Sequence, residues 1–342
     1  NKIEHATFGL EYAVKVLDFL EDYFKVEYPL EKCDLVAVPD FESGGMENWG
    51  LITFREDLLL FDDELSTLSD KQAIALTIAH EIAHQWFGNL VTMKWWDELW
   101  LNEGFANFME FYIVDQIFPE WRIFEECLVS EKSSAIRLDS LPSSKAIIKK
   151  VSSPQQALEC FDEIAYEKSG SIVRMLHNLI GESAFRSGLN DYFQKHQYKS
   201  ASSQDLIKAW QKYSKIDLDK FVKTWLHQPG LPVVKVQLSE RPNLIKLTQS
   251  RFLSEKPTKV NLAKLLTSVT TSMPNIKKLQ KSFYLNQLSN SLKEQNSQTS
   301  PTLWQIPIDF VSPPSTNSLI HPLILKKESH FLQLDSSQNL PL

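Results

Sequence analysis

Residues 80–108 of the chain have the sequence HEIAHQWFGNLVTMKWWDELWLNEGFANF, and this stretch decides how the rest is interpreted. Its first motif is HEIAH at residues 80–84. Histidines four positions apart on a helix lie on one face, with Cβ atoms about 5–6 Å apart, so both imidazoles can reach one cation. Glu81 lies about 100° around the helix axis from His80, where it can reach a water beside the cation but not join the ligand pair. The motif therefore predicts a helix that carries two metal ligands, His80 and His84, and a general base.

A third ligand is predicted at Glu103, in the sequence NEGFA, with eighteen residues between it and His84. A catalytic zinc takes three protein ligands and keeps one position open, and two histidines with one glutamate supply that set. Gly104 lacks a side chain, and we expect two helices to approach closely there around the metal. The alternative is a polar helix stripe that faces solvent, which explains neither the spacing nor the apolar residues around both histidines.

The predicted metal site changes how two further segments are interpreted. Residues 44–50, GGMENWG, combine two glycines, which let another backbone pass close by, with the carboxylate of Glu47. Without the zinc motif this segment is equally well an ordinary turn, and with it we expect an edge strand that pairs with an extended peptide. Tyr166 lies at the start of a predicted helix, where a single tyrosine usually serves packing.

Hydrophobic spacing predicts where helices and strands lie. Ser69 and Asp70 are the candidate N-caps of the helix that carries the two histidines. The predicted helices cover about residues 8–24, 69–87, 97–118, 163–180, 182–196, 203–213 and 217–227. The predicted strands cover about residues 34–39, 51–61, 233–238, 244–247, 304–310 and 323–325.

Glycine usage marks a domain boundary, since all ten glycines lie at or before Gly230. The sequence HQPGLP at residues 227–232 predicts a helix stop followed by a rigid turn. We therefore expect a catalytic domain over residues 1–230 and a small β-sandwich over residues 231–342. Residues 254–301 are polar and rich in Ser, Asn and Gln toward their end, which predicts a long insertion within a hairpin.

Composition limits the possible partners. The net charge of −7 argues against binding to a phosphate backbone, so we expect no nucleic-acid partner. The three cysteines, Cys33, Cys127 and Cys160, form no CxxC pair, which favours a reducing, cytoplasmic location over a disulfide framework or a thiolate zinc site. No apolar run is long enough to span a bilayer and no signal peptide opens the chain, although its first residue is Asn1 rather than Met, as in a fragment.

Four stretches of the chain resemble the aminopeptidase N family of zinc metallopeptidases, with an overall look of a soluble bacterial or archaeal member. The matching sequences are residues 44–50, 80–108, FDEIAYEKSGSIVRML at 161–176 and WLHQPGLPVV at 225–234. The resemblance covers residues from about 1 to 250, with a further match at 304–308, and has no counterpart here of the family's N-terminal β-domain and C-terminal helical domain. It implies an α+β fold in which a thermolysin-like catalytic domain precedes the β-sandwich.

The resemblance also implies a role for each site residue. His80, His84 and Glu103 would bind one zinc ion per chain, and Glu81 would activate the zinc-bound water. Tyr166 would donate its hydroxyl to the oxyanion of the tetrahedral intermediate. Glu47 would bind the free α-amino group of a peptide, and the backbone at the glycines would align it. The substrate-binding positions implied are Gly44, Gly45, Met46, Glu47 and Asn48.

The implied activity is that of a zinc aminopeptidase, a hydrolase whose partners are peptides with a free N-terminus. Two departures from the family pattern leave alternatives open. Gly45 stands where the family usually has Ala and is typical of bifunctional epoxide hydrolase relatives, while Ser169 stands where Gly is usual. A family member without catalysis would have lost a ligand or the base, and a thermolysin-like endopeptidase would not need the carboxylate of Glu47. The preferred N-terminal residue and the oligomeric state stay undetermined by the sequence.

Overall fold

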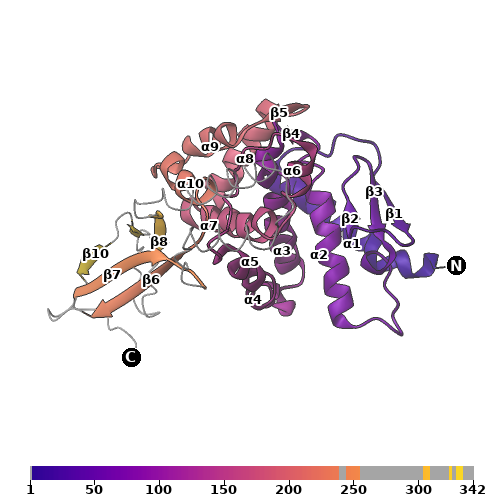
Figure 1. The fold of residues 1–342 in the computed structure, drawn as a ribbon. Helices are drawn as coiled ribbons and strands as arrows, with labels where there is room; N and C mark the ends of the chain where they lie inside the picture. Colours follow the sequence, from indigo (N-terminus) through magenta and orange to yellow (C-terminus); the bar gives the residue numbers. More distant parts are fainter. Residues whose placement is uncertain (1, 239–243, 255–302, 309–322, 326–328, 334–342) are drawn as a thin grey trace, which may run out of the picture. The chain divides into compact units, whose positions relative to one another are not determined.

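The computed structural model describes residues 2–238, 244–254, 303–308, 323–325 and 329–333 (Figure 1). Their mixture of helices and strands confirms the α+β class. The chain forms two compact units. The first comprises Asn1–Asp139, Ser143–Leu231 and Trp304–Leu325, and the second comprises Ser140–Pro142, Pro232–Leu303 and Lys326–Leu342.

The first unit opens with a helix and a small sheet. A 3₁₀ turn, η1 (Ile3–Ala6), leads into α1 (Thr7–Phe24), which precedes strands β1 (Asp34–Val38), β2 (Gly45–Met46) and β3 (Leu51–Arg55). The sheet order is β1-β3-β2, with β1 parallel and β2 antiparallel to β3, so β2 lies at the edge. The strand predicted over 51–61 is too long, because the chain turns into a 3₁₀ helix, η2 (Glu56–Leu58), directly after Arg55.

Helix α2 (Leu68–Ala83) carries the HEIAH motif and corrects the predicted N-cap. Thr67, not Ser69 or Asp70, is the cap, since its hydroxyl accepts from the Asp70 N–H while the Asp70 carboxylate accepts from the Thr67 N–H. The α-helix also ends at Ala83, four residues before the predicted end at Phe87.

The helix predicted over 97–118 is divided in two. Residues Trp96–Leu101 form a 3₁₀ helix, η3, and the α-helix α3 (Glu103–Ile117) begins only at the predicted ligand. Glu98, inside η3, has non-helical dihedrals with ψ 19°, so η3 and α3 are not one continuous α-helix. Glu103 is therefore the first residue of α3 rather than an interior one.

The remaining helices of the first unit fall into two groups. Four were expected from hydrophobic spacing: α7 (Ser169–Ile180), α8 (Glu182–His196), α9 (Ser203–Gln211) and α10 (Leu218–Leu226). Sequence spacing missed three shorter ones: α4 (Ile123–Val129), α5 (Glu131–Asp139) and α6 (Pro154–Leu158). Short parallel strands β4 (Val91–Met93) and β5 (Lys199–Ala201) were also missed.

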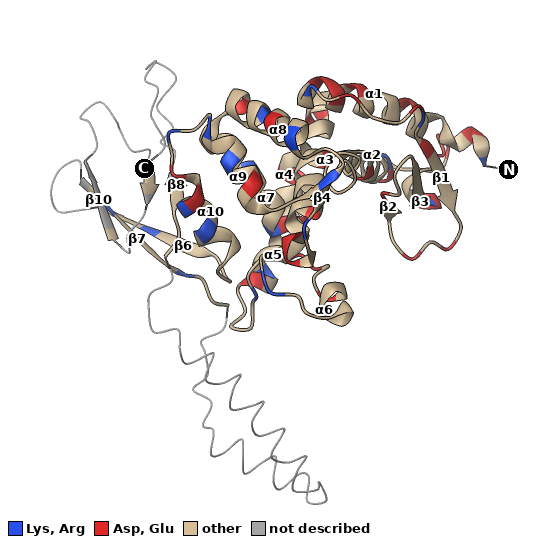
Figure 2. Cartoon of the chain, turned by 90° about the horizontal axis from the view of Figure 1, so that it is seen from above, with Lys and Arg blue, Asp and Glu red and all other residues tan. Residues whose placement is uncertain are grey.

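Lys and Arg are interspersed with Asp and Glu along α8, α9 and α10, with ion pairs such as Lys223–Asp219 (Figure 2).

The core of this unit fixes the helix that bears the two histidines. Helix α2 packs against both α1 and α3, and α3 packs against α7. Aromatic side chains close the space just beyond α2: the Phe87 ring stacks on Phe105 with centroids 4.4 Å apart and meets Phe24 edge-on at 5.4 Å. The indole N–H of the buried Trp86 donates to the Val26 carbonyl. Aromatic packing and this hydrogen bond thus fix the position of the C-terminal end of α2.

The second unit contains an antiparallel sheet of order β10-β7-β6, formed by β6 (Pro232–Leu238), β7 (Leu244–Arg251) and β10 (Ser329–Gln333). β7 is longer than predicted, and β10 was not predicted. The strands β8 (Ile306–Ile308) and β9 (Leu323–Leu325) pair antiparallel within the first unit. The predicted insertion at 254–301 lies outside the described residues except at Ser254. Every helix in the described part of the chain is too short or too polar to cross a membrane.

Candidate metal centre and active site

Three side chains from two helices converge at the end of α2. The Glu103 Oε2 atom lies 3.4 Å from His80 Nε2 and 3.4 Å from His84 Nε2. His84 follows the last residue of α2 but keeps helical dihedrals, and its N–H bonds to the His80 carbonyl, so the two rings stay on one face. A tetrahedral ion with bonds of about 2.0–2.1 Å places its ligand atoms roughly 3.3–3.4 Å apart. Both distances from Glu103 therefore match the separation that a tetrahedral zinc requires, and all three ligand atoms lie within 4.8 Å of one another.

Hydrogen bonds on the far side of each imidazole leave the correct nitrogen for a metal. His84 Nδ1 lies 3.0 Å from the Phe87 carbonyl oxygen, which can only accept, so Nδ1 carries the proton. His80 Nδ1 lies 2.7 Å from the Glu110 carboxylate. In each ring Nε2, which faces Glu103, is then free to bind a cation, an arrangement typical of metal-bound histidines.

The ionisation of this cluster favours a cation at its centre. Burial raises and the histidines lower the pKa of Glu103, and the net result is a pKa of about 2. Burial opposes protonation of the histidines, but the carboxylates outweigh it and raise the pKa of His84 to about 9 and that of His80 well above its usual range. The buried, ionised carboxylate of Glu103 is thus stabilised by positive charge beside it, which protons on the histidines provide when no metal is bound.

A second set of possible ligands, Glu47, Glu81 and His84, also lies within 4.8 Å. It shares His84 with the first set but contains two carboxylates and a single imidazole. Zinc prefers nitrogen and sulfur ligands, and the first set alone among the described residues offers two imidazoles with a carboxylate. The first set therefore fits zinc better.

Glu81 has the environment of a proton acceptor. Glu81 is 5% exposed, and its Oε2 atom has no hydrogen-bond partner among the residues that the structure describes. Burial raises its pKa to about 7, with the histidines opposing and Glu47 adding to the shift. Its carboxylate lies against strand β2, where a Cβ on Gly45 would come within 2.3 Å of Glu81 Oε1. Glycine at position 45 thus leaves Glu81 the room it occupies.

Segment 44–50 is fixed to the end of α2 by side-chain amides. Gln85 Nε2 and Asn89 Nδ2 both donate to the Glu47 carbonyl, at 3.2 and 2.7 Å, and Asn102 Nδ2 donates to the Glu47 carboxylate at 3.1 Å. Because these hydrogen bonds hold both the backbone and the side chain of Glu47, its carboxylate is fixed close to Glu81 and His84. Asn48 is exposed and donates instead to Thr53 Oγ1 at 3.3 Å within the turn.

Tyr166 lies on a π-helical turn, η5 (Ile164–Lys168), immediately before α7. Its ring stacks on the His80 ring, with centroids 6.1 Å apart and planes 15° from parallel. Burial, together with Glu103 and Glu47, raises the pKa of Tyr166 well above its usual range. The hydroxyl therefore keeps its proton near neutrality and can act as a donor beside the candidate metal centre.

All these groups line one cleft of about 640 Å³, whose walls come from β2, α2, η3, α3 and η5. It includes Gly44, Gly45, Met46 and Glu47 of the predicted substrate-binding residues, whereas Asn48 lies outside the lining set. Met93, Trp96 and Phe161 add apolar surface. The cleft thus brings together the predicted ligands, base, tyrosine and glutamate, although they are up to about 120 positions apart in sequence.

A sequence profile of the Peptidase family M1 domain matches residues 8–225, which is most of the first unit. The chain belongs to the peptidase M1 family. The match includes every predicted site residue, from Gly44 to Tyr166.

Curated relatives of this M1 chain are aminopeptidases by name. It is 43% identical to Aminopeptidase M1 of Arabidopsis thaliana over 253 residues, which cover 74% of this chain and 28% of the relative. It is 44% identical over 252 residues to Glutamyl aminopeptidase of Bitis rhinoceros, covering 74% and 26%, respectively. It is 42% identical over 256 residues to Puromycin-sensitive aminopeptidase of Caenorhabditis elegans, covering 74% and 27%. The chain thus spans less than a third of the length of these relatives.

Sequence reasoning missed the residues that support the M1 site. Glu110, Asn102, Gln85 and Asn89 all touch a predicted site residue, yet none belongs to a recognised spacing. One available signal was polarity, because Glu110 is the one charged residue in FMEFYIV at residues 108–114, a stretch of α3 that is otherwise apolar. A buried carboxylate needs a hydrogen-bond or charged partner, and the nearby candidate partner is His80.

The expectation for Gly104 needs correction. A Cβ at this position would come within 2.2 Å of Ser169 Oγ, so the close approach is between α3 and the start of α7, not between the two ligand-bearing helices. Ser169, where the family usually has glycine, is fully buried against it. Gly104 therefore sets the distance from Glu103 to the turn that carries Tyr166.

Proposed function

We propose that this chain is the catalytic part of a zinc-dependent aminopeptidase, which removes N-terminal residues from peptides by hydrolysis. The observation that carries the proposal is the 3.4 Å separation of Glu103 Oε2 from both His80 Nε2 and His84 Nε2, in a cleft that also contains Glu81 and Tyr166. The aminopeptidase names of the relatives support the choice of reaction.

The chemistry requires a polarised carbonyl and an activated water. A zinc ion held by His80, His84 and Glu103 supplies a Lewis acid for the carbonyl and lowers the pKa of a water toward about 7. Glu81, with its unpartnered oxygen and a pKa of about 7, takes the proton from the attacking water. It then gives that proton to the departing amine, so that one carboxylate serves both steps.

Tyr166 and Glu47 act on opposite ends of the residue that is removed. The protonated hydroxyl of Tyr166 donates to the oxyanion, a charge that exists only as the reaction proceeds. The carboxylate of Glu47, oriented by Asn102, binds the free α-ammonium of the substrate. The edge strand β2 offers Gly45 and Met46 for backbone pairing with the peptide.

The finer account of fold and location is part of the same proposal. We assign residues 1–230 to a thermolysin-like catalytic domain and residues 231–342 to a β-sandwich. The helices around α2 support the first assignment and the antiparallel β10-β7-β6 sheet supports the second, whereas β8 and β9 group with the first unit. We assign the protein to the cytoplasm, supported by its three cysteines, all of which are free thiols.

A panel of aminoacyl reporter substrates tests the function. We expect hydrolysis that a chelator abolishes and added zinc restores. Glu81→Gln should keep the metal but lose several orders of magnitude in kcat, because an amide cannot accept the proton. Zinc-replete protein that hydrolyses no free-amine substrate, or a Glu81→Gln variant that turns over normally, would refute the proposal.

A further inference from the structure

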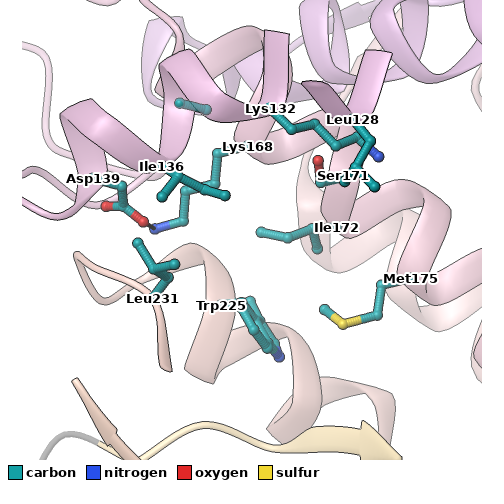
Figure 3. Close-up of a pocket in the computed structure, with 11 residues that line it drawn as sticks. Leu128, Lys132, Ile136, Asp139, Lys168, Ser171, Ile172, Met175, Trp225 and Leu231 are labelled. Atoms are coloured by element: carbon teal, nitrogen blue, oxygen red, sulfur yellow. Dashed lines mark ion pairs between the residues drawn. The ribbon is translucent and has the colours of Figure 1, made fainter. Parts of the chain in front are cut away.

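A second hollow lies in the first unit, formed by residues that the aminopeptidase chemistry does not use. It has a volume of about 240 Å³, and its lining comes from α4, α5, η5, α7, α10 and Leu231 (Figure 3). On α5 the residues Lys132, Ala135, Ile136 and Asp139 follow helical spacing, so they form one face of that helix. None of the eleven lining residues lines the metal-centre cleft.

The walls of this hollow are apolar and partly open to solvent. Ile172 of α7 is buried at its base, and Met175 and Trp225 add apolar surface. Leu128 and Ile136, which also line it, are 60% and 43% exposed. An apolar concavity of this kind, with a few polar groups, is the usual form of a small-molecule site.

The charged side chains at the two ends of the hollow differ in whether they are paired. Lys168 is buried and forms an ion pair of 2.8 Å with the buried Asp139, so these two charges compensate each other. Asp139 also accepts from the Gly230 N–H at 2.8 Å, and Lys168 donates to the Gly230 carbonyl at 3.0 Å. This end of the hollow is therefore electrically neutral and rigid.

Lys132 differs, since its ammonium is half-buried and lies within 4.0 Å of no carboxylate oxygen in the part of the chain that the structure describes. Burial and the nearby Arg174 lower the pKa of Lys132, while Cys127 and Glu131 oppose the shift without reversing it. Arg174 itself lies over the Phe124 ring, 3.8 Å from its centroid, and has no carboxylate partner among the described residues. Figure 3 shows Lys132 and Lys168 at opposite ends of the row of lining side chains.

We propose that this hollow binds a small amphipathic carboxylate, with its apolar body among Ile136, Ile172 and Trp225 and its carboxylate on Lys132. The ligand is an anion because, of the two lysines that line the hollow, Lys168 is paired with Asp139, whereas Lys132 has no carboxylate within 4.0 Å among the described residues and stands at the other end of an apolar hollow. The volume of the hollow limits the size of the ligand. An apolar cavity of about 150 Å³ accepts benzene, so about 240 Å³ accepts one ring with a short chain, or an aliphatic chain of similar bulk.

Calorimetric titration with octanoate, 1-octanol and octylammonium tests the proposal on the metal-loaded protein. We expect saturable binding of octanoate with a dissociation constant on the order of 1 mM or below, and binding at least about 10-fold weaker for the other two. Equal affinity for octanol and octanoate would overturn the assignment of an anion, and no saturable binding of octanoate would overturn the site.

Matched variants locate the binding. Lys132→Met should weaken octanoate about 10-fold and leave octanol unchanged, whereas Lys15→Met, at an exposed lysine of α1, should change neither. Ile136→Trp fills the mouth and should abolish binding, while Val129→Trp, at an exposed position outside the lining set, should not. Because a carboxylate can also bind a zinc ion, the titration is repeated with His80→Ala. Octanoate binding that disappears in His80→Ala, or survives unchanged in Ile136→Trp, would refute the site without bearing on the peptidase proposal.

Discussion

Glu110→Gln is the perturbation whose effect follows most directly from the geometry of the metal centre. Glu110 is 8% exposed and receives two donors: His80 Nδ1 lies 2.7 Å from Oε2, and Asn107 Nδ2 lies 2.9 Å from Oε1. An amide of the same shape has only one oxygen, so one of these buried donors loses its acceptor. That loss costs about 1–3 kcal/mol, and the negative charge that makes His80 a better ligand disappears as well.

The expected result is a zinc dissociation constant raised about 10–100-fold, as for other groups that hydrogen-bond a metal-bound histidine. Competition against a chromophoric chelator measures this constant directly and does not depend on turnover. Glu120→Gln, an exposed substitution just beyond α3, is the matched control and should leave zinc affinity unchanged. A Glu110→Gln protein that keeps its circular dichroism spectrum and binds zinc as tightly as wild type would refute the reasoning.

Three more outcomes are expected. Tyr166→Phe should lower kcat by about 10²–10³ with little change in KM, since its hydroxyl acts on the oxyanion; steady-state kinetics showing only a raised KM would contradict this. Glu47→Ala should narrow the rate difference between a free-amine peptide and its N-acetylated form, and equal cleavage of the two by wild type would exclude a role for the ammonium. Burial and neighbouring carboxylates raise the pKa of Glu131 from 4.5 to about 8, so the folded state binds the extra proton and this group's contribution to stability is lost as pH rises through that range. Glu131→Gln should therefore raise the unfolding temperature more at pH 8 than at pH 5, and a difference no larger than that of the exposed control Glu126→Gln would be evidence against it.

The long helices were predictable because their hydrophobic spacing is strong. α1, α8, α9 and α10 begin and end within about two residues of the ranges that spacing predicts. Helix α7 begins at Ser169, later than the predicted start at residue 163, because η5 precedes it. The short α4 and α6 were not predictable, because seven and five residues give too few turns for a period to emerge. Helix α5 is as long as the predicted α9 and α10, but its sequence EKSSAIRLD is mostly polar and shows no clear apolar face. The N-cap of α2 was misplaced because Thr67, Ser69 and Asp70 are all good capping residues, and only the reciprocal hydrogen bonds distinguish them.

The convergence of His80, His84 and Glu103 could be predicted because their spacing within one motif and to Glu103 is itself the signal. Their supports could not, since Glu110 and Asn102 act through contacts that form only after α2, α3 and segment 44–50 have packed together. The π-helical turn that carries Tyr166 was hidden as well, because nothing in its composition separates it from an ordinary helix start. The resemblance to a family directed attention to that tyrosine, and the stacking of its ring on His80 is a structural result.

The zinc content of purified protein, measured by elemental analysis together with peptidase activity, tests the central claim most directly. The account predicts about one zinc per chain in wild type, loss of zinc and activity in equal proportion as chelator is added, and little zinc in His80→Ala. His196→Ala, a histidine outside the ligand set, should retain both. Undiminished zinc in His80→Ala, or full activity in wild-type protein that has been freed of metal, would contradict the claim that His80, His84 and Glu103 hold the catalytic ion.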